Sequence, residues 1–453
     1  MYLYVHIPFC KSKCSYCDFF SVPLAADSSI PDSYIDALLK EAAYRKHLHG
    51  ISVWSSIYLG GGTPGLLSPA QLKRLLEGLY KICPPQSDAE ITLEVNCADI
   101  AEKNACGFSS YLEEVSALGV NRISAGIQSF NDRALRAVGR RSSSAQIKSA
   151  LENLRQWRNG NSSAGARFFP DSDSAVRGLS SRTRVPLPLS CRRFSCDLIA
   201  GLPYLSTDDF CTGLHELIGY EPDHISLYSL MIEAGTPLEK QLAGGLLDFD
   251  EEAADEQWLS GRDILEKAGY RQYEVSNFAK AGFESVHNRA YWKMKDYIGI
   301  GCAAVGTVGS VRYTGTRDIK AYTDFWTGFN PIPPADADCF CRTADCYACA
   351  GTNASACEQA AKNSAVPESV SAQEHISADE AITEFLMMGF RLSEGISAYE
   401  FKKRFGLELK DFIEPVFSRW QKRGLAETDG ENRRLTKEGL LFLNEFLAEI
   451  VSI

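Results

Sequence analysis

The sequence predicts an α/β protein, in which alternating strands and helices form a partial (β/α)6 barrel and a smaller C-terminal α+β domain of winged-helix type follows. Short β-rich segments alternate with amphipathic segments from residue 2 to about residue 300. After residue 377 the pattern becomes mainly helical and ends in a short hairpin and a last helix. The length of 453 residues also exceeds what one compact core normally holds.

Repeated strand–helix units of this kind form parallel sheets that are covered by helices. The six expected strands are Tyr2–Ile7, Ser56–Leu59, Ile91–Val95, Arg122–Ile127, Phe194–Ile199 and His224–Leu230. Apolar residues at helical spacing predict helices over Ser33–His47, Pro69–Lys81, Tyr111–Leu118, Ala145–Trp157 and Glu252–Ala268. In such a barrel the chemistry is expected at the C-terminal ends of the strands.

Three parts are expected along the chain. Residues 1–325 would form the barrel and its extension, with a Ser-, Arg-, Gly- and Pro-rich insertion at 158–192. Residues 326–376 would be a Cys-rich insertion of low complexity, and residues 377–453 the C-terminal domain. In that domain we expect a hairpin with its turn at Asp429-Gly430, a last helix to about Ile450, and helices over Asp379–Phe390, Ser397–Phe405 and Leu409–Lys422.

Composition and charge exclude several classes of protein. A winged helix often binds DNA, but the net charge of -11 and the lack of a strongly basic helix favour a packing role and argue against a nucleic-acid partner. The start MYLYVHIPF lacks the basic region of a secretory signal, and no uncharged apolar run is long enough to span a bilayer. Fifteen cysteines, an odd number, fit a reducing environment. We therefore expect a cytoplasmic protein, and a peripheral membrane contact is compatible with the sequence.

The loop after the first expected strand carries Cys10, Cys14 and Cys17 at C-x3-C-x2-C spacing. Three thiolates are one fewer than a four-iron cluster ligated only by cysteine needs, so one iron would keep an open site for a small molecule. Half of a zinc site is an alternative, with His6 as the only near fourth ligand. Structural thiols without a metal are another.

Polar and glycine residues recur at the ends of the later strands. GGGTP at 60–64 allows close approach of backbone groups to a ligand, although a simple tight turn would look the same. Glu94 ends the third strand, where a carboxylate can accept the hydroxyls of a ribose or simply face solvent. Gln128 follows at the end of the fourth strand, Arg140 lies twelve residues after it, and the fifth strand carries Asp197, which together predict a site on the barrel rim.

These residues give the sequence a resemblance to the HemN/HemW group of radical S-adenosylmethionine (SAM) proteins. That group comprises oxygen-independent coproporphyrinogen III oxidase and the related HemW haem chaperone. The likeness runs from residue 2 to about 325 and from about 378 to the end. Its segments are YVHIPFC, GGGTP, GIQSF, DLIAGLP, LYSLMIEAGTPL, YEVSNFA and HNRAYW.

The resemblance implies a radical SAM barrel and assigns a role to individual positions. A [4Fe–4S] cluster would be held by Cys10, Cys14 and Cys17. The SAM bound to it would be contacted by Tyr4, Gly61 and Glu94. Positions that hold a second SAM in the oxidase are matched by Tyr16, Gly62, Thr63, Gln128, Arg140 and Asp197. Whether one or two SAM molecules bind here stays open.

Two features favour the HemW side of the group. The oxidase has a fourth cysteine two places after the third, where this chain has Phe19, and it has a long N-terminal extension, whereas here Cys10 comes almost at once. The resemblance therefore implies a haem chaperone, rather than an enzyme, that passes haem to acceptor haem proteins, respiratory ones included. The alternative is oxygen-independent coproporphyrinogen III dehydrogenase, a radical SAM enzyme of haem biosynthesis. A homodimer is compatible with either function.

The element HNRAYW resembles a haem-associated motif of the chaperone members. Its His287, Asn288 and Tyr291 are the expected haem-binding residues. A neutral imidazole is a good axial ligand for haem iron, and aromatic neighbours can stack on the macrocycle. The alternative is a structural histidine in a polar turn.

Some features have no counterpart in the group. Cys97 stands where proline usually follows Asn96, Ser142 replaces a common histidine, and the region around Ala304 lacks a histidine before Gly306. A C-x2-C pair lies within a second cysteine group, which would bind zinc or an iron–sulfur cluster or consist of incidental thiols. This group comprises Cys339, Cys341, Cys346, Cys349 and Cys357.

Overall fold

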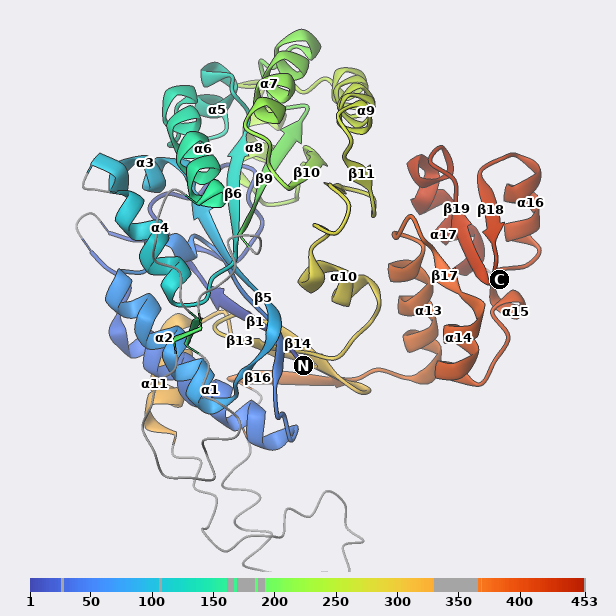
Figure 1. Ribbon diagram of the computed structural model, residues 1–453. Helices are drawn as coiled ribbons and strands as arrows, with labels where there is room; N and C mark the ends of the chain where they lie inside the picture. The colour runs from blue at the N-terminus through green and yellow to red at the C-terminus, as the bar shows by residue number, and fades with distance from the viewer. Residues whose placement is uncertain are drawn as a thin grey trace, which may run out of the picture.

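The computed structural model describes residues 1–25, 28–105, 108–160, 192–329, 366–367 and 369–451. Between residues 160 and 192 it also describes two short strands, β7 (Arg167–Phe168) and β8 (Arg184–Val185). In this part of the chain the buried apolar residues form two separate cores. One core extends from Leu3 to Val370 and the other from Ile382 to Ile450. Figure 1 shows the two units side by side, the first coloured blue to orange and the second orange-red to red. The second cysteine group lies outside the described residues, as does most of the insertion at 158–192.

Six parallel strands form the centre of the main sheet and lie side by side in the order of the chain. They are β1 (Tyr2–Ile7), β4 (Trp54–Gly61), β5 (Pro85–Asn96), β6 (Arg122–Gln128), β9 (Arg193–Ala200) and β10 (His224–Ser229). All six were predicted from the sequence. In β1, Leu3, Val5 and Ile7 are fully buried in the core, and the polar or aromatic residues between them point to the other face. The partial barrel is therefore confirmed.

Both ends of this sheet are extended by further strands. Beyond β1 lie β13 (Tyr297–Ile300), β14 (Val305–Val308), β15 (Val311–Gly315) and β16 (Ser371–His375). Beyond β10 lie β12 (Asn277–Ala279) and β11 (Arg271–Gln272). Among the described strands, β11 and β16 form the two edges, so the sheet does not close. β16 was expected to belong to the insertion at 326–376. It was missed because four of its five residues are exposed and give no apolar alternation.

Helices cover the outer face of the sheet, as Figure 1 shows. Two of them begin with a reciprocal capping box, formed by Ser68 with Gln71 and by Ser143 with Gln146, which satisfies backbone N–H groups at the helix start. No helix in the described ranges has the length and apolar character to cross a membrane. The helices of this unit are α1 (Asp32–Leu48), α2 (Pro69–Ile82), α3 (Cys97–Ala105), α4 (Phe108–Ala117), α5 (Asp132–Ala137), α6 (Ser144–Asn159), α7 (Thr207–Gly219), α8 (Pro237–Ala243), α9 (Glu251–Lys267), α10 (Val286–Trp292) and α11 (Ile319–Gly328).

The C-terminal unit is the expected α+β domain with a small wing. Its three-stranded sheet has the order β17 (Ile396–Ser397), β19 (Asn432–Leu435), β18 (Ala426–Asp429). The single helix expected over 409–422 is in fact two, separated at Pro415, because proline lacks the N–H that a continuing helix needs. The helices are α13 (Ala378–Gly389), α14 (Ala398–Phe405), α15 (Lys410–Ile413), α16 (Val416–Lys422) and α17 (Leu443–Val451). The domain boundaries expected from the sequence stay a prediction.

Candidate cofactor site

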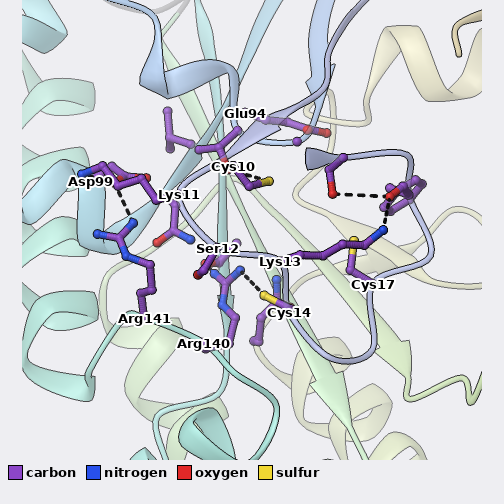
Figure 2. A pocket seen from close by; sticks show the side chains of 18 of the residues that line it. Cys10, Lys11, Ser12, Lys13, Cys14, Cys17, Glu94, Asp99, Arg140 and Arg141 are labelled. Atoms are coloured by element: carbon purple, nitrogen blue, oxygen red, sulfur yellow. Dashed lines mark hydrogen bonds and ion pairs between the residues drawn. The ribbon is translucent and has the colours of Figure 1, made fainter. Parts of the chain in front are cut away.

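The cysteine loop leaves the C-terminal end of β1 and is held in place at both ends. β2 (Phe9–Cys10) pairs in parallel with β3 (Val22–Pro23), which closes the loop at its base. The tip is fixed by two backbone hydrogen bonds of Ser15, whose N–H donates to the Val138 carbonyl at 3.0 Å and whose carbonyl accepts from the Leu238 N–H at 3.0 Å. The loop therefore has a defined position on the rim of the barrel (Figure 2).

The three cysteines of this loop are half-buried free thiols over a common pocket. The Thr63 hydroxyl donates to Cys10 Sγ at 3.6 Å, and Arg140 Nη1 donates to Cys14 Sγ at 3.7 Å. Burial raises the pKa of the Cys10 and Cys17 thiols. A hydroxyl and a guanidinium directed at the sulfur atoms are the surroundings that stabilise a thiolate.

The donor set fits an iron–sulfur cluster better than a zinc ion. In the part of the chain that the structure describes, no three His, Cys, Asp or Glu side chains converge on one metal position. Figure 2 shows the three sulfur atoms apart from one another. Zinc requires its donors around one ion, whereas a cluster distributes its thiolates over separate irons. His6 is no fourth ligand, since its Nε2 donates to the Phe20 carbonyl at 2.9 Å and its Nδ1 accepts from the Tyr4 hydroxyl at 2.9 Å.

The glycine segment at the end of β4 packs directly against the cysteine loop. The Gly62 N–H donates to the Ile7 carbonyl at 2.9 Å, and the Thr63 N–H donates to the Phe9 carbonyl at 2.8 Å. Gly61 has a φ of 112°, and a Cβ on Gly62 would lie only 2.6 Å from the Phe9 carbonyl oxygen. Gly61 requires glycine because of its positive φ and the nearby His6 ring, and Gly62 requires it because the backbone of Phe9 lies too close for a side chain.

Replacing Gly62 by alanine is therefore expected to lower the free energy of unfolding by about 1–3 kcal/mol, because backbone must move to admit the methyl group. Chemical denaturation would measure the change. Gly219→Ala is the matched control, since a Cβ there meets nothing within 4 Å. Equal stability of the two variants would contradict the close packing of loop and strand.

Glu94 lies at the end of β5 with two donors on its carboxyl group. The Tyr58 hydroxyl donates to Oε1 at 2.6 Å, and the Gly61 N–H donates to Oε2 at 3.1 Å. Burial, and then the charge of Asp197, raise the pKa of Glu94 to about 7. The carboxyl group is thus poised to change its charge near neutral pH. Tyr58 was not predicted as a site residue. The available signal was its position two residues before Gly60 on β4, which places both residues on the same face of the strand.

A pocket of about 950 Å³ joins the cysteine loop to the strand ends. Its wall includes an amide oxygen, Oε1 of Gln128, that is buried and has no hydrogen-bond partner among the described residues. Gln128 holds a positive φ of 64°, which turns the chain at the end of β6. Tyr4 does not line the pocket but lies behind it, bonded to His6. The other expected site residues that line it are Cys10, Cys14, Cys17, Tyr16, Gly61, Gly62, Thr63, Glu94, Gln128, Arg140 and Asp197.

A network of four charges lies at the mouth of this pocket and was not predicted. Lys11 on the cysteine loop pairs with Asp99 at 3.0 Å and with Glu102. Arg141 pairs with Asp99 at 3.0 Å (Figure 2) and with Glu102 at 2.6 Å. The network joins the loop, α3 and the segment after α5. Such a charge network holds its members more firmly than a single exposed pair does.

The positions that depart from the family's usual sequence are accommodated locally. The Ser142 hydroxyl donates to Asn96 Oδ1 at 2.8 Å and accepts from the Ala98 N–H at 3.1 Å. Asn96 Oδ1 also accepts from the Ala98 N–H at 3.0 Å. These bonds cap the start of α3, which begins at Cys97.

His287 does not line this pocket and is fully buried. Its two ring nitrogens are 2.7 Å from the Ser56 hydroxyl and 2.7 Å from the Tyr291 hydroxyl. Its ring stacks on Tyr58 at 5.1 Å, and burial lowers its pKa to about 3. Both nitrogens are therefore occupied in this conformation. Asn288, on the same helix, is half-buried, and its N–H bonds to the Ser285 hydroxyl that caps α10.

Comparison with known proteins agrees with the fold and the site. A model described as the radical SAM superfamily matches residues 4–161, and one described as the HemN C-terminal domain matches residues 376–442. The solved coproporphyrinogen III oxidase HemN from Escherichia coli is similar over 99% of this chain and 89% of its own, with a TM-score of 0.70 at 20% identity. Fold and site thus define a radical SAM protein with a HemN-type C-terminal domain.

Relatives that match over nearly the full length of the chain identify its family within the radical SAM class. The heme chaperone HemW of E. coli (strain K12) is 30% identical over 98% of this chain and 96% of its own length. HemW of Haemophilus influenzae is 31% identical with the same coverage of 98% and 96%. A mitochondrial radical S-adenosyl methionine domain-containing protein 1 of Bos taurus is 35% identical over 67% of this chain, which spans only 60% of that relative's length. The chain belongs to the HemW family of radical SAM proteins.

Proposed function

We propose that this protein binds haem and transfers it to acceptor haem proteins, respiratory ones included. The observation that carries the proposal is Phe19, which lines the pocket and is 72% exposed. The resemblance to the group places a fourth cysteine at this position in the oxidase. The nearly complete coverage of two relatives named as heme chaperones supports the same conclusion.

The proposed cofactors are a [4Fe–4S] cluster on Cys10, Cys14 and Cys17 and a SAM molecule beside it. When bound, the pair supplies the redox chemistry of the superfamily. In this protein we assign them a role in assembly or conformation rather than turnover. The residues proposed to hold SAM are Tyr4, Gly61 and Glu94, with Tyr16, Gly62, Thr63, Gln128, Arg140 and Asp197 for a second molecule. Tyr4 does not line the pocket and is bonded to His6.

The charge state of Glu94 should make SAM binding depend on pH. A carboxylate accepts hydrogen bonds from ribose hydroxyls better than a carboxylic acid does, and a pKa of about 7 leaves Glu94 mostly protonated at pH 6. We expect SAM to bind roughly tenfold more weakly at pH 6 than at pH 8. Calorimetric titration of the reconstituted protein would measure this.

The control for this prediction is Glu94→Gln, which should bind SAM with little pH dependence over the same range. Tyr58 and Asp197 face the same carboxyl group, and neither is replaced. Equal pH dependence in the variant and the natural protein would place the titrating group elsewhere.

The alternative function is oxygen-independent coproporphyrinogen III dehydrogenase, which the fold similarity to HemN favours. One experiment separates the two. After anaerobic reconstitution, haemin is titrated by absorbance, and coproporphyrinogen III turnover is assayed with SAM and a reductant. A saturable Soret shift without turnover supports the chaperone. Turnover that depends on Cys10, Cys14 and Cys17 would make the protein an enzyme despite Phe19.

Location and assembly complete the proposal. All eight cysteines of the described ranges are free thiols, which supports a reducing, cytoplasmic location. The proposal also includes a homodimer, which light scattering would test, and a peripheral membrane contact, which vesicle sedimentation would test.

A further inference from the structure

A groove opens beside the last residue of the HNRAYW motif, although the histidine of that motif is buried. The groove has a volume of about 1140 Å³ and lies between α10 with its following loop and the C-terminal domain. Figure 1 shows α10 on the side of the barrel that faces α13. Its lining residues include Trp292, Lys293 and Lys295 from the barrel unit and Phe385, Ile396 and Arg404 from the C-terminal domain.

The two units are fastened to each other around this groove. Glu394 pairs with Arg289 at 3.1 Å and with Lys293 at 2.7 Å. Arg404 Nη1 donates to the Met294 carbonyl at 2.9 Å. These contacts connect the two walls of the groove. The groove is therefore a feature of the assembled molecule and depends on both units.

Aromatic and aliphatic side chains give the groove surfaces suited to a flat ring. Trp292 and Phe385 line it from opposite units, with Leu392 and Ile396 beside them. Arg391 covers the Trp292 ring at 4.6 Å. The indole Nε1 of Trp292 is buried and has no hydrogen-bond partner among the described residues.

The rim of the groove carries more positive than negative charge. Its cations are Lys293, Lys295 and Arg404, and its anions are Glu394 and Glu400. The charge of Glu394 is compensated by its ion pairs with Arg289 and Lys293. Lys295, in contrast, is exposed and forms no ion pair within the described residues. A ligand with an apolar planar body and carboxylates at one edge matches this arrangement.

We propose that this groove, rather than the His287 imidazole, receives haem, with the porphyrin between Trp292 and Phe385 and its carboxylates toward Lys295 and Arg404. The inference rests on the proposed function. His287 is then a positioning residue, because its bonds to Ser56 and Tyr291 hold α10 and thereby Trp292.

The test uses two charge changes that should act in opposite directions. Lys295→Glu replaces an attraction by a repulsion and is expected to raise the Kd for haemin about threefold to tenfold. Glu400→Gln removes a repulsion and is expected to lower the Kd about threefold. Both residues are exposed, so the fold should be kept, and circular dichroism would verify it. Lys73→Glu on α2, an exposed lysine far along the chain, is the matched control.

The ratio of the two Kd values decides the proposal. A ratio of about five or more between Lys295→Glu and Glu400→Gln, with Lys73→Glu unchanged, supports the groove. A smaller ratio in a protein that binds haemin overturns the groove and leaves the chaperone function standing. If the natural protein shows no saturable Soret shift, the proposed function itself fails. Haemin binding by the unsubstituted protein therefore distinguishes failure of the groove proposal from failure of the proposed function.

Discussion

Replacing Cys14 by serine is expected to abolish stable assembly of the iron–sulfur cluster. Each of the three loop thiols would ligate a different iron, so loss of one leaves an iron without a protein ligand. Cys14 also accepts from Arg140 at 3.7 Å, so the variant leaves a guanidinium facing a hydroxyl group in place of a sulfur atom. We expect the iron bound after anaerobic reconstitution to fall from about four atoms per chain to nearly none.

The matched control is Cys211→Ser, which changes a half-buried free thiol on α7. It should retain the full iron content, since it lies outside the cysteine loop. Iron analysis together with the visible spectrum would measure both variants. Full iron content in Cys14→Ser would exclude the loop as the cluster site and would direct attention to the second cysteine group.

Replacing His287 by alanine is expected to lower the free energy of unfolding by about 3–5 kcal/mol. The substitution removes a fully buried ring and leaves the hydroxyls of Ser56 and Tyr291 without their partner. It also removes the surface on which Tyr58 stacks. Because burial lowers the pKa of His287 to about 3, its contribution to stability is complete above about pH 6.5 and is lost as the pH falls toward 3.

Denaturant unfolding with the exposed His215→Ala as control would measure this effect. His215 should be within about 0.5 kcal/mol of the natural protein. The opposite result is also informative. If His287→Ala unfolds like the natural protein but loses the haemin Soret shift, the imidazole is an axial ligand after all, as the resemblance of the motif implies.

The sequence was sufficient for the framework of the barrel and for most of the pocket. Leu3, Val5 and Ile7 alternate with polar or aromatic residues in β1, so this strand could be identified without a partner. Because residues at the ends of parallel strands meet on one rim, the Cys loop, Glu94 and Asp197 could be expected at one site. The pocket lining agrees with that expectation.

The interactions that the sequence did not reveal are contacts between distant residues. Lys11 and Asp99 are separated by most of two strand–helix units, and no local pattern encodes which exposed charges will pair. His6 looked like a spare metal ligand because its partners, Tyr4 and Phe20, are hidden in the sequence. His287 looked accessible for the same reason. Burial of a polar residue is decided by tertiary packing, not by spacing along the chain.

The separation of the two hydrophobic cores has a thermodynamic consequence. A domain of roughly 70–80 residues buries a smaller fraction of its surface than a large one, so the C-terminal unit carries a small share of the stability. Heating should then produce two calorimetric transitions rather than one. A ligand that contacts both walls of the groove binds only while both units are folded, so it would raise the lower transition and merge it with the upper one. The number of melting steps would thus report whether the groove is filled.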